Sequence, residues 1–68
     1  MVSNLKLERI KRETTQMDLS MKTGIPQWRI SLIERGIPPM KDEAERIAQA
    51  LSCRIIDIFP QNETAQSG

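Results

Sequence analysis

Histidine is absent from this chain of 68 residues, and cysteine occurs only once, as Cys53. Without histidine the chain lacks the commonest general base and metal ligand. A single cysteine excludes an intramolecular disulfide and a cysteine-based zinc site. The apolar runs are too short to cross a bilayer. We therefore expect a non-enzymatic protein of a reducing compartment, the cytoplasm, with no cofactor, no metal and no membrane partner.

Aromatic residues and net charge are also scarce. One Trp, one Phe and no Tyr predict a compact aliphatic core in a single small domain. Ten basic and nine acidic residues give a net charge of +1. Residues 1–36 hold seven basic and four acidic residues, whereas residues 37–68 hold three and five. A polyanionic partner would therefore meet the N-terminal half of the chain.

The spacing of apolar residues predicts helices, and no segment alternates as a strand does. A first helix is expected over residues 2–13, and one face of it would carry Val2, Leu5, Arg9 and Ile10. A fourth helix has the clearest apolar stripe, which consists of Met40, Ala44, Ile47, Ala48 and Leu51. A short last turn is expected at 55–59, and the polar residues 61–68 are expected to be disordered.

Residues 15–35 predict two short helices joined by a tight turn. Thr15 should N-cap the first, at about 16–22, and Asp18 should complete a variant of the capping box. Gly24 suits the left-handed position at which this helix ends. So tight a turn forbids antiparallel packing, and the next helix must therefore cross steeply, as in a helix-turn-helix. Its outer face could then enter a DNA major groove about 12 Å wide.

The second of these helices is expected over residues 26–34. Pro26 suits its first turn, because the missing N–H would have no partner there. Pro26, Ile30 and Ile33 share one side at helical spacing and should face the core.

Several groups of residues resemble the pattern of the Cro/repressor-type helix-turn-helix family, the XRE family. They are Thr15-Gln16, Leu19-Ser20, Gly24-Ile25, Ile30-Ser31 and Ile33-Glu34-Arg35-Gly36, together with Arg9, Ala48 and Leu51. The resemblance covers residues 5–59. It implies an all-α, five-helix, lambda-repressor-like domain over residues 1–60 that binds double-stranded DNA.

The resemblance also implies roles for individual side chains. The residues placed where relatives read base edges are Gln27, Trp28, Arg29 and Leu32. Those placed near phosphates are Gln16, Ser31, Arg35 and Lys41. Each polar member of these sets is also open to a simpler interpretation as solvated surface. In the family, the positions of Arg9 and Glu34 form a partly buried ion pair, which we expect here as a structural contact.

Two features leave alternatives open. Trp28 is expected on an outward position, where it could contact a thymine methyl, fold down against Met21, or mark a protein-binding surface. Symmetric dimers of the family often form through C-terminal helices, and we expect the dimer seam at Ile56 and Phe59. The simpler interpretation is that Ile56 only completes the core.

The chain departs from the family pattern at two places. Pro26 replaces the Ser or Thr that normally caps the DNA-reading helix. The connector at Ile37, Pro38 and Pro39 is short and lacks the cations that relatives place near phosphates, although Lys41 could substitute in part. Fewer phosphate contacts mean weaker binding by a monomer, so we expect tight binding to need a dimer.

These observations predict a sequence-specific transcriptional regulator, prokaryotic or phage-encoded, that acts as a homodimer on a palindromic operator. A toxin or a polymerase could be a further partner, and the sequence does not identify one. The alternative is a protein-interaction module of the same fold that uses Trp28 and the exposed methionines.

Overall fold

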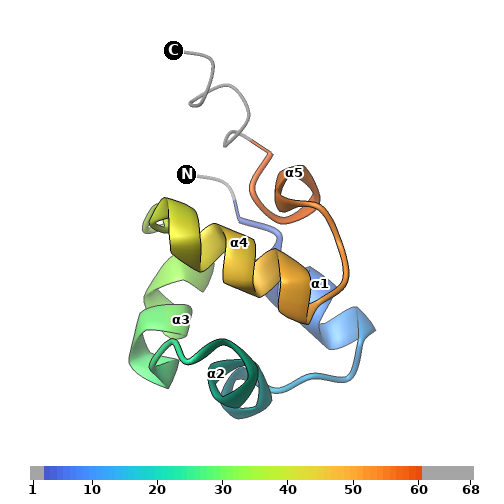
Figure 1. The fold of residues 1–68 in the computed structure, drawn as a ribbon, viewed down its shortest axis with the longest axis vertical. Helices are drawn as coiled ribbons and strands as arrows, with labels where there is room; N and C mark the ends of the chain where they lie inside the picture. Colours follow the sequence, from blue (N-terminus) through green and yellow to red (C-terminus); the bar gives the residue numbers. More distant parts are fainter. Residues whose placement is uncertain (1–2, 61–68) are drawn as a thin grey trace.

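The structure, a computed structural model, describes residues 3–60, and these contain five helices and no strand. The helices are α1 (Leu5–Lys11), α2 (Gln16–Thr23), α3 (Gln27–Glu34), α4 (Lys41–Ala50) and α5 (Ile55–Ile58). Figure 1 shows α4 lying across the molecule, with α2 and α3 below it and α5 at the end where the described chain stops. The all-helical fold expected from the sequence is therefore confirmed. Residues 61–68, for which disorder is predicted, lie outside the described residues.

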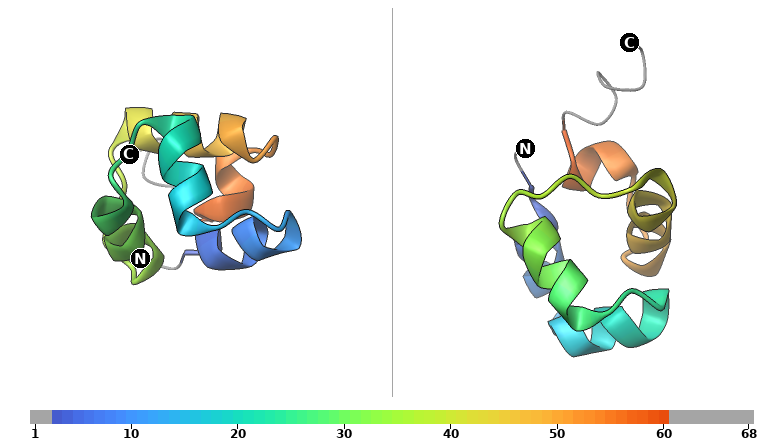
Figure 2. Two further views of the ribbon diagram at one scale, coloured as in Figure 1. Left: turned by 90° about the horizontal axis from the view of Figure 1, so that it is seen from below. Right: turned by 90° about the vertical axis from the view of Figure 1, so that its left-hand side faces the viewer.

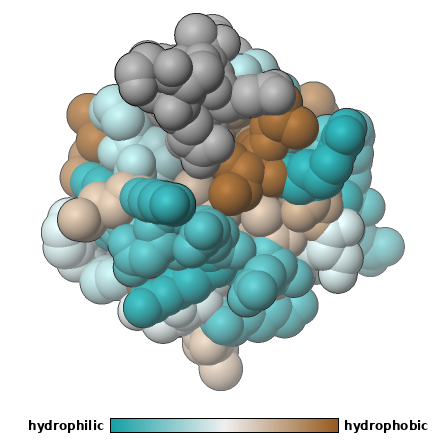
Figure 3. Space-filling view, turned by 45° about the horizontal axis from the view of Figure 1, so that its top comes forward, coloured by the Kyte–Doolittle hydropathy of each residue, from teal (hydrophilic) through white to brown (hydrophobic). Residues whose placement is uncertain are grey.

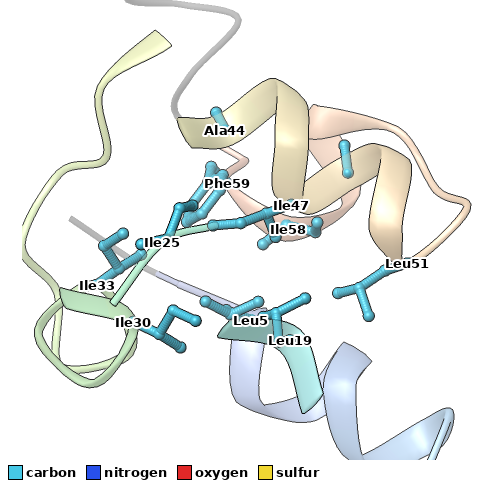
Figure 4. Close-up of a cluster of buried hydrophobic side chains, with 11 residues drawn as sticks. Leu5, Leu19, Ile25, Ile30, Ile33, Ala44, Ile47, Leu51, Ile58 and Phe59 are labelled. Atoms are coloured by element: carbon cyan, nitrogen blue, oxygen red, sulfur yellow. The ribbon is translucent and has the colours of Figure 1, made fainter. Parts of the chain in front are cut away.

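The core is aliphatic apart from one phenylalanine, as the composition predicts. All five helices and the turn after α2 contribute to it, which ties the short helices to one another (Figure 4). Its buried members are Leu5, Leu19, Ile25, Ile30, Ile33, Ala44, Ile47, Ala48, Leu51, Ile58 and Phe59. A helix of seven or eight residues is marginal in water by itself, so this shared burial stabilises the individual helices.

The turn between α2 and α3 is fixed by small polar side chains. Gly24 has φ of +79°, the left-handed conformation expected from the sequence. Thr23 Oγ1 donates to the Leu19 carbonyl at 2.8 Å and accepts from the Ile25 N–H at 3.1 Å. Ser20 Oγ donates to the Ile25 carbonyl at 2.6 Å. These bonds satisfy backbone groups at the turn and fix the direction in which α3 leaves it.

The two helices around this turn cross steeply. In Figure 1, α2 is seen almost along its axis while α3 runs down the page, and the right-hand view of Figure 2 shows them meeting at an angle. The start of α2 has the predicted capping box: Thr15 Oγ1 accepts from the Asp18 N–H at 3.0 Å, and Asp18 accepts from the Thr15 N–H at 3.1 Å. The helix-turn-helix arrangement predicted from the sequence is therefore present.

The first helix is shorter than the predicted span of 2–13, and its predicted apolar face is partly wrong. Leu5 is buried, but Ile10 is 54% exposed. Ile10 follows Leu5 by five residues, which places it about 140° around a helix of 3.6 residues per turn. The helix ends before Glu13, whose φ is +51°, and Val2 lies outside the described residues.

Two residues predicted to face the core are exposed for a common reason. Pro26 is exposed and Met40 is 64% exposed. Each occupies the N-cap position before its helix, with ψ of 145° at Pro26 and 160° at Met40. An N-cap residue has a non-helical backbone, so the periodicity of the helix that follows does not orient its side chain.

Candidate nucleic-acid interface

The outer face of α3 is the surface on which the sequence places base-reading residues. Gln27 is exposed and Trp28 is 66% exposed, both in the first turn of α3, and Leu32 is partly exposed one turn later. Opposite them, Ile30 and Ile33 are fully buried and fix the rotation of the helix. This surface therefore combines an amide, an indole and an aliphatic side chain.

Trp28 does not fold down against Met21, which was one of its three predicted environments. Met21 on α2 is 78% exposed, so an indole does not cover it. Met17, on the same helix, is 54% exposed. Contact with DNA and contact with a partner protein both remain compatible with these exposures.

A chain of hydrogen bonds connects the interior to the start of α3. Arg9 Nε donates to Glu34 Oε2 at 2.8 Å, and both side chains are largely buried, with exposures of 11% and 7%. Gln16 Nε2 donates to Glu34 Oε1 at 3.0 Å, and Gln27 Nε2 donates to Gln16 Oε1 at 3.4 Å. The structure thus brings four of the predicted site residues together.

The Arg9–Glu34 pair joins α1 to the end of α3. Arg9 also donates from its NH1 nitrogen to the Thr14 carbonyl at 2.9 Å, which anchors the segment between α1 and α2. The pair therefore ties the first helix to the helix-turn-helix unit. Gln16, the first residue of α2, is held in place by the same carboxylate.

Arg29 is not directed outward as a base-reading residue would be. Its guanidinium lies against Glu43 in α4, with Nε to Oε2 and NH2 to Oε1 distances of 2.9 Å each. Hydrogen bonding to Arg29 is the main reason why the pKa of Glu43 is lowered, and Glu43 raises the pKa of Arg29 in turn. The predicted base-reading role of Arg29 is therefore not supported by its position in the structure.

Glu43 is not among the site residues predicted from the sequence. A carboxylate three residues after an N-cap is a known signature, because it can accept the N-cap N–H. Glu43 Oε1 accepts the Met40 N–H at 2.8 Å in this way. That pattern could have been found in the sequence, whereas the pairing with Arg29 across fourteen residues could not.

The residues predicted near phosphates lie on α3 or at the ends of helices. Arg35 and Lys41 are exposed, Ser31 is partly buried, and Gln16 is partly buried at the start of α2. Arg35 closes α3 and Lys41 opens α4. The side chains therefore occupy three separate helix ends and one position on α3.

The predicted dimer seam is wrong at one of its two residues. Phe59 is completely buried in the core, so it offers no surface to a second copy. Ile56 is partly buried and retains some exposed surface. The end of the molecule brought forward in Figure 3 is largely hydrophilic, with a small apolar patch beside the atoms drawn in grey.

No helix within residues 3–60 is long and apolar enough to span a membrane. In the same range, no group of three or more Cys, Asp or Glu side chains is arranged to hold a metal ion.

Comparison with known proteins agrees with the geometry of α2 and α3. A protein-family model described as helix-turn-helix matches residues 5–58, nearly all of the described chain. No curated protein matches the sequence. The steep crossing of α2 and α3, the left-handed glycine between them and the match to the family model lead to one conclusion: the chain belongs to the XRE family of helix-turn-helix proteins, which are DNA-binding transcriptional regulators.

Proposed function

We propose that this protein is a sequence-specific transcriptional regulator that inserts α3 into the major groove of operator DNA. The observation that carries the proposal is the contact between Gln16 and Gln27, whose amides lie 3.4 Å apart. It joins the start of α2 to the start of α3, so that one amide can face the DNA backbone while the other faces base edges. Amide side chains are suited to both tasks, because Gln pairs with adenine through two hydrogen bonds.

Within this proposal, base reading falls to the exposed face of α3. Gln27 reads an adenine, while Trp28 and Leu32 contact thymine methyl groups or sugar edges. Phosphate contacts come from Gln16, Ser31, Arg35 and Lys41, which lie on α3 or at the ends of α2, α3 and α4. Few of these residues are cationic, so a single copy binds DNA with modest affinity and a shallow salt dependence.

We further propose that the regulator acts as a homodimer on a near-palindromic operator. Two copies of α3 would then lie about 34–36 Å apart, one helical turn of DNA. Ile56 is the remaining candidate for the dimer seam, because it is the residue of the original pair that keeps exposed surface. Binding would block a promoter or bring the regulator into contact with polymerase. We place this activity in the prokaryotic cytoplasm, where the regulated genes could belong to a phage, a toxin–antitoxin pair or a restriction–modification operon. Residues 1–60 form the whole DNA-binding domain in this proposal.

A protein-interaction module of the same fold is the second candidate. The exposures of Trp28, Met21 and Met17 favour it, because large apolar side chains on one helix pair are typical of protein-binding surfaces. Salt distinguishes the two functions. The DNA affinity of a regulator falls by about 0.9 log units per neutralised phosphate for each tenfold rise in salt, whereas an apolar protein interface responds little.

Replacing Gln16 by alanine is expected to weaken binding to all DNA sequences to a similar extent, by about tenfold per site, since a phosphate contact carries no sequence information. The measurement is the Kd of the variant for several unrelated duplexes, with Gln49→Ala on α4 as the matched control. If Gln16→Ala changes the preferred sequence but not the general affinity, Gln16 is a base-reading residue and the assignment is wrong.

A further inference from the structure

Glu43 holds three parts of the structure together from the first turn of α4. Its carboxylate accepts the Met40 N–H at 2.8 Å, which caps α4. The same carboxylate makes two contacts of 2.9 Å with the Arg29 guanidinium, which belongs to α3. The Arg29 NH2 nitrogen is also 3.4 Å from the Pro38 carbonyl in the connector between α3 and α4.

This contact is stronger than an ordinary surface ion pair. The two side chains are only 21% and 13% exposed, and the guanidinium meets both carboxylate oxygens. Bidentate, charge-assisted hydrogen bonds of this kind fix geometry as well as contributing energy. Mutual stabilisation lowers the pKa of Glu43 and raises the pKa of Arg29, so both groups are charged at neutral pH.

The position of Arg29 makes its pairing important for DNA binding. Arg29 is the only Lys or Arg within Gln27–Glu34. It lies on the flank of α3, between exposed Trp28 and buried Ile30. An arginine on the flank of a groove-binding helix is long enough to reach the phosphates that border the groove. In this protein, the carboxylate of Glu43 neutralises that cation instead.

We propose that Glu43 is a positioning residue for DNA recognition: it keeps Arg29 against α4 and the connector, and so withholds the one cation of α3 from the phosphates. The inference rests on the proposed insertion of α3 into the groove. Its consequence is a lower affinity for all DNA, because a phosphate contact strengthens binding to every sequence equally and leaves the ratio of operator to random affinity unchanged. When Arg29 makes no phosphate contact, DNA binding depends more strongly on the base contacts of α3 and on the pairing of two copies.

The test compares Glu43→Gln with Asp42→Asn. Glutamine can still accept the Met40 N–H at this helix position but no longer binds Arg29 as a charge. Asp42→Asn removes the same charge from the neighbouring residue, whose ion pair with Arg46 is longer, at 3.6 Å, and exposed. Both variants shift the net charge equally, so a difference between them reports the release of Arg29.

The measurement is the Kd for a random-sequence duplex and for the selected operator, as a function of salt. Relative to Asp42→Asn, the salt slope of Glu43→Gln is expected to steepen by about 0.9 per bound chain, and the affinity for both duplexes at low salt is expected to rise by a similar factor. The double variant Arg29→Gln/Glu43→Gln should return to the slope of Asp42→Asn. Equal slopes for Glu43→Gln and Asp42→Asn would overturn the proposal.

Arg29→Gln alone supplies a second test that does not depend on the folding of Glu43→Gln. If Glu43 withholds Arg29, this variant keeps the salt slope of the original protein. A slope shallower by about 0.9 would mean that Arg29 contacts a phosphate in the complex, which contradicts the proposal. A chain that binds no duplex DNA at low salt would contradict the proposed function itself, and the role of Glu43 with it.

Discussion

Replacing Phe59 by alanine is expected to lower the free energy of unfolding by about 3–5 kcal/mol, because a large buried side chain would leave a cavity. Phe59 is completely buried, and Figure 4 shows its ring among Ile25, Ile47 and Ile58. A domain of this size has a total stability of only about 3–5 kcal/mol. The variant should therefore be largely unfolded at 25 °C.

Urea unfolding followed by far-ultraviolet circular dichroism measures this effect, with Phe59→Leu as the conservative comparison. The leucine variant should lose much less stability, because most of the volume remains filled. The result also decides between the core position of Phe59 and the dimer seam first predicted for it. A Phe59→Ala variant that stays folded but changes from dimer to monomer would instead support the prediction that Phe59 belongs to the dimer seam.

Replacing Glu34 by alanine is the second change with a large expected effect, a loss of about 3 kcal/mol in the free energy of unfolding. The side chain of Arg9 is only 11% exposed in the original protein, and the substitution leaves its guanidinium without its carboxylate partner. It also removes the acceptor that orients Gln16. The loss arises mainly from the uncompensated buried charge, and removing both partners should therefore be less damaging than the sum of two single changes.

The matched control is Glu45→Ala, which removes an exposed carboxylate from α4. Thermal and urea unfolding of Glu34→Ala, Glu45→Ala and the double variant Arg9→Met/Glu34→Met provide the comparison. Little loss is expected for Glu45→Ala, since exposed charges contribute little to stability. A Glu34→Ala protein as stable as Glu45→Ala would show that the pair is not a structural tie between α1 and α3.

The sequence predicted those features that are encoded locally. The capping box of Thr15 and Asp18, the left-handed turn at Gly24 and the buried face of Ile30 and Ile33 each depend on residues within one turn or helix. Short-range geometry determines them, so they can be derived from spacing. The resemblance to a known family added the pairing of α1 with α3, which periodicity alone does not predict.

The sequence failed where a side chain is placed by another element or by a helix end. Met40 and Pro26 precede their helices, and the helical period therefore misplaced them. The four residues of α5 are too few to define a face, so nothing in its pattern distinguished buried Phe59 from exposed surface. The contact between Arg29 and Glu43 could not be predicted, because the two side chains come from different helices.

Selection of binding sites from a pool of random duplex DNA, with the original protein and with Gln27→Ala in parallel, tests most directly whether α3 reads DNA sequence. We predict that the original protein enriches a near-palindromic site with half-site centres about 10 base pairs apart. Gln27→Ala should lose the preference at one base pair in each half-site and keep the others. Enrichment of the same sequence by both proteins, or of none by the original protein, would contradict the account.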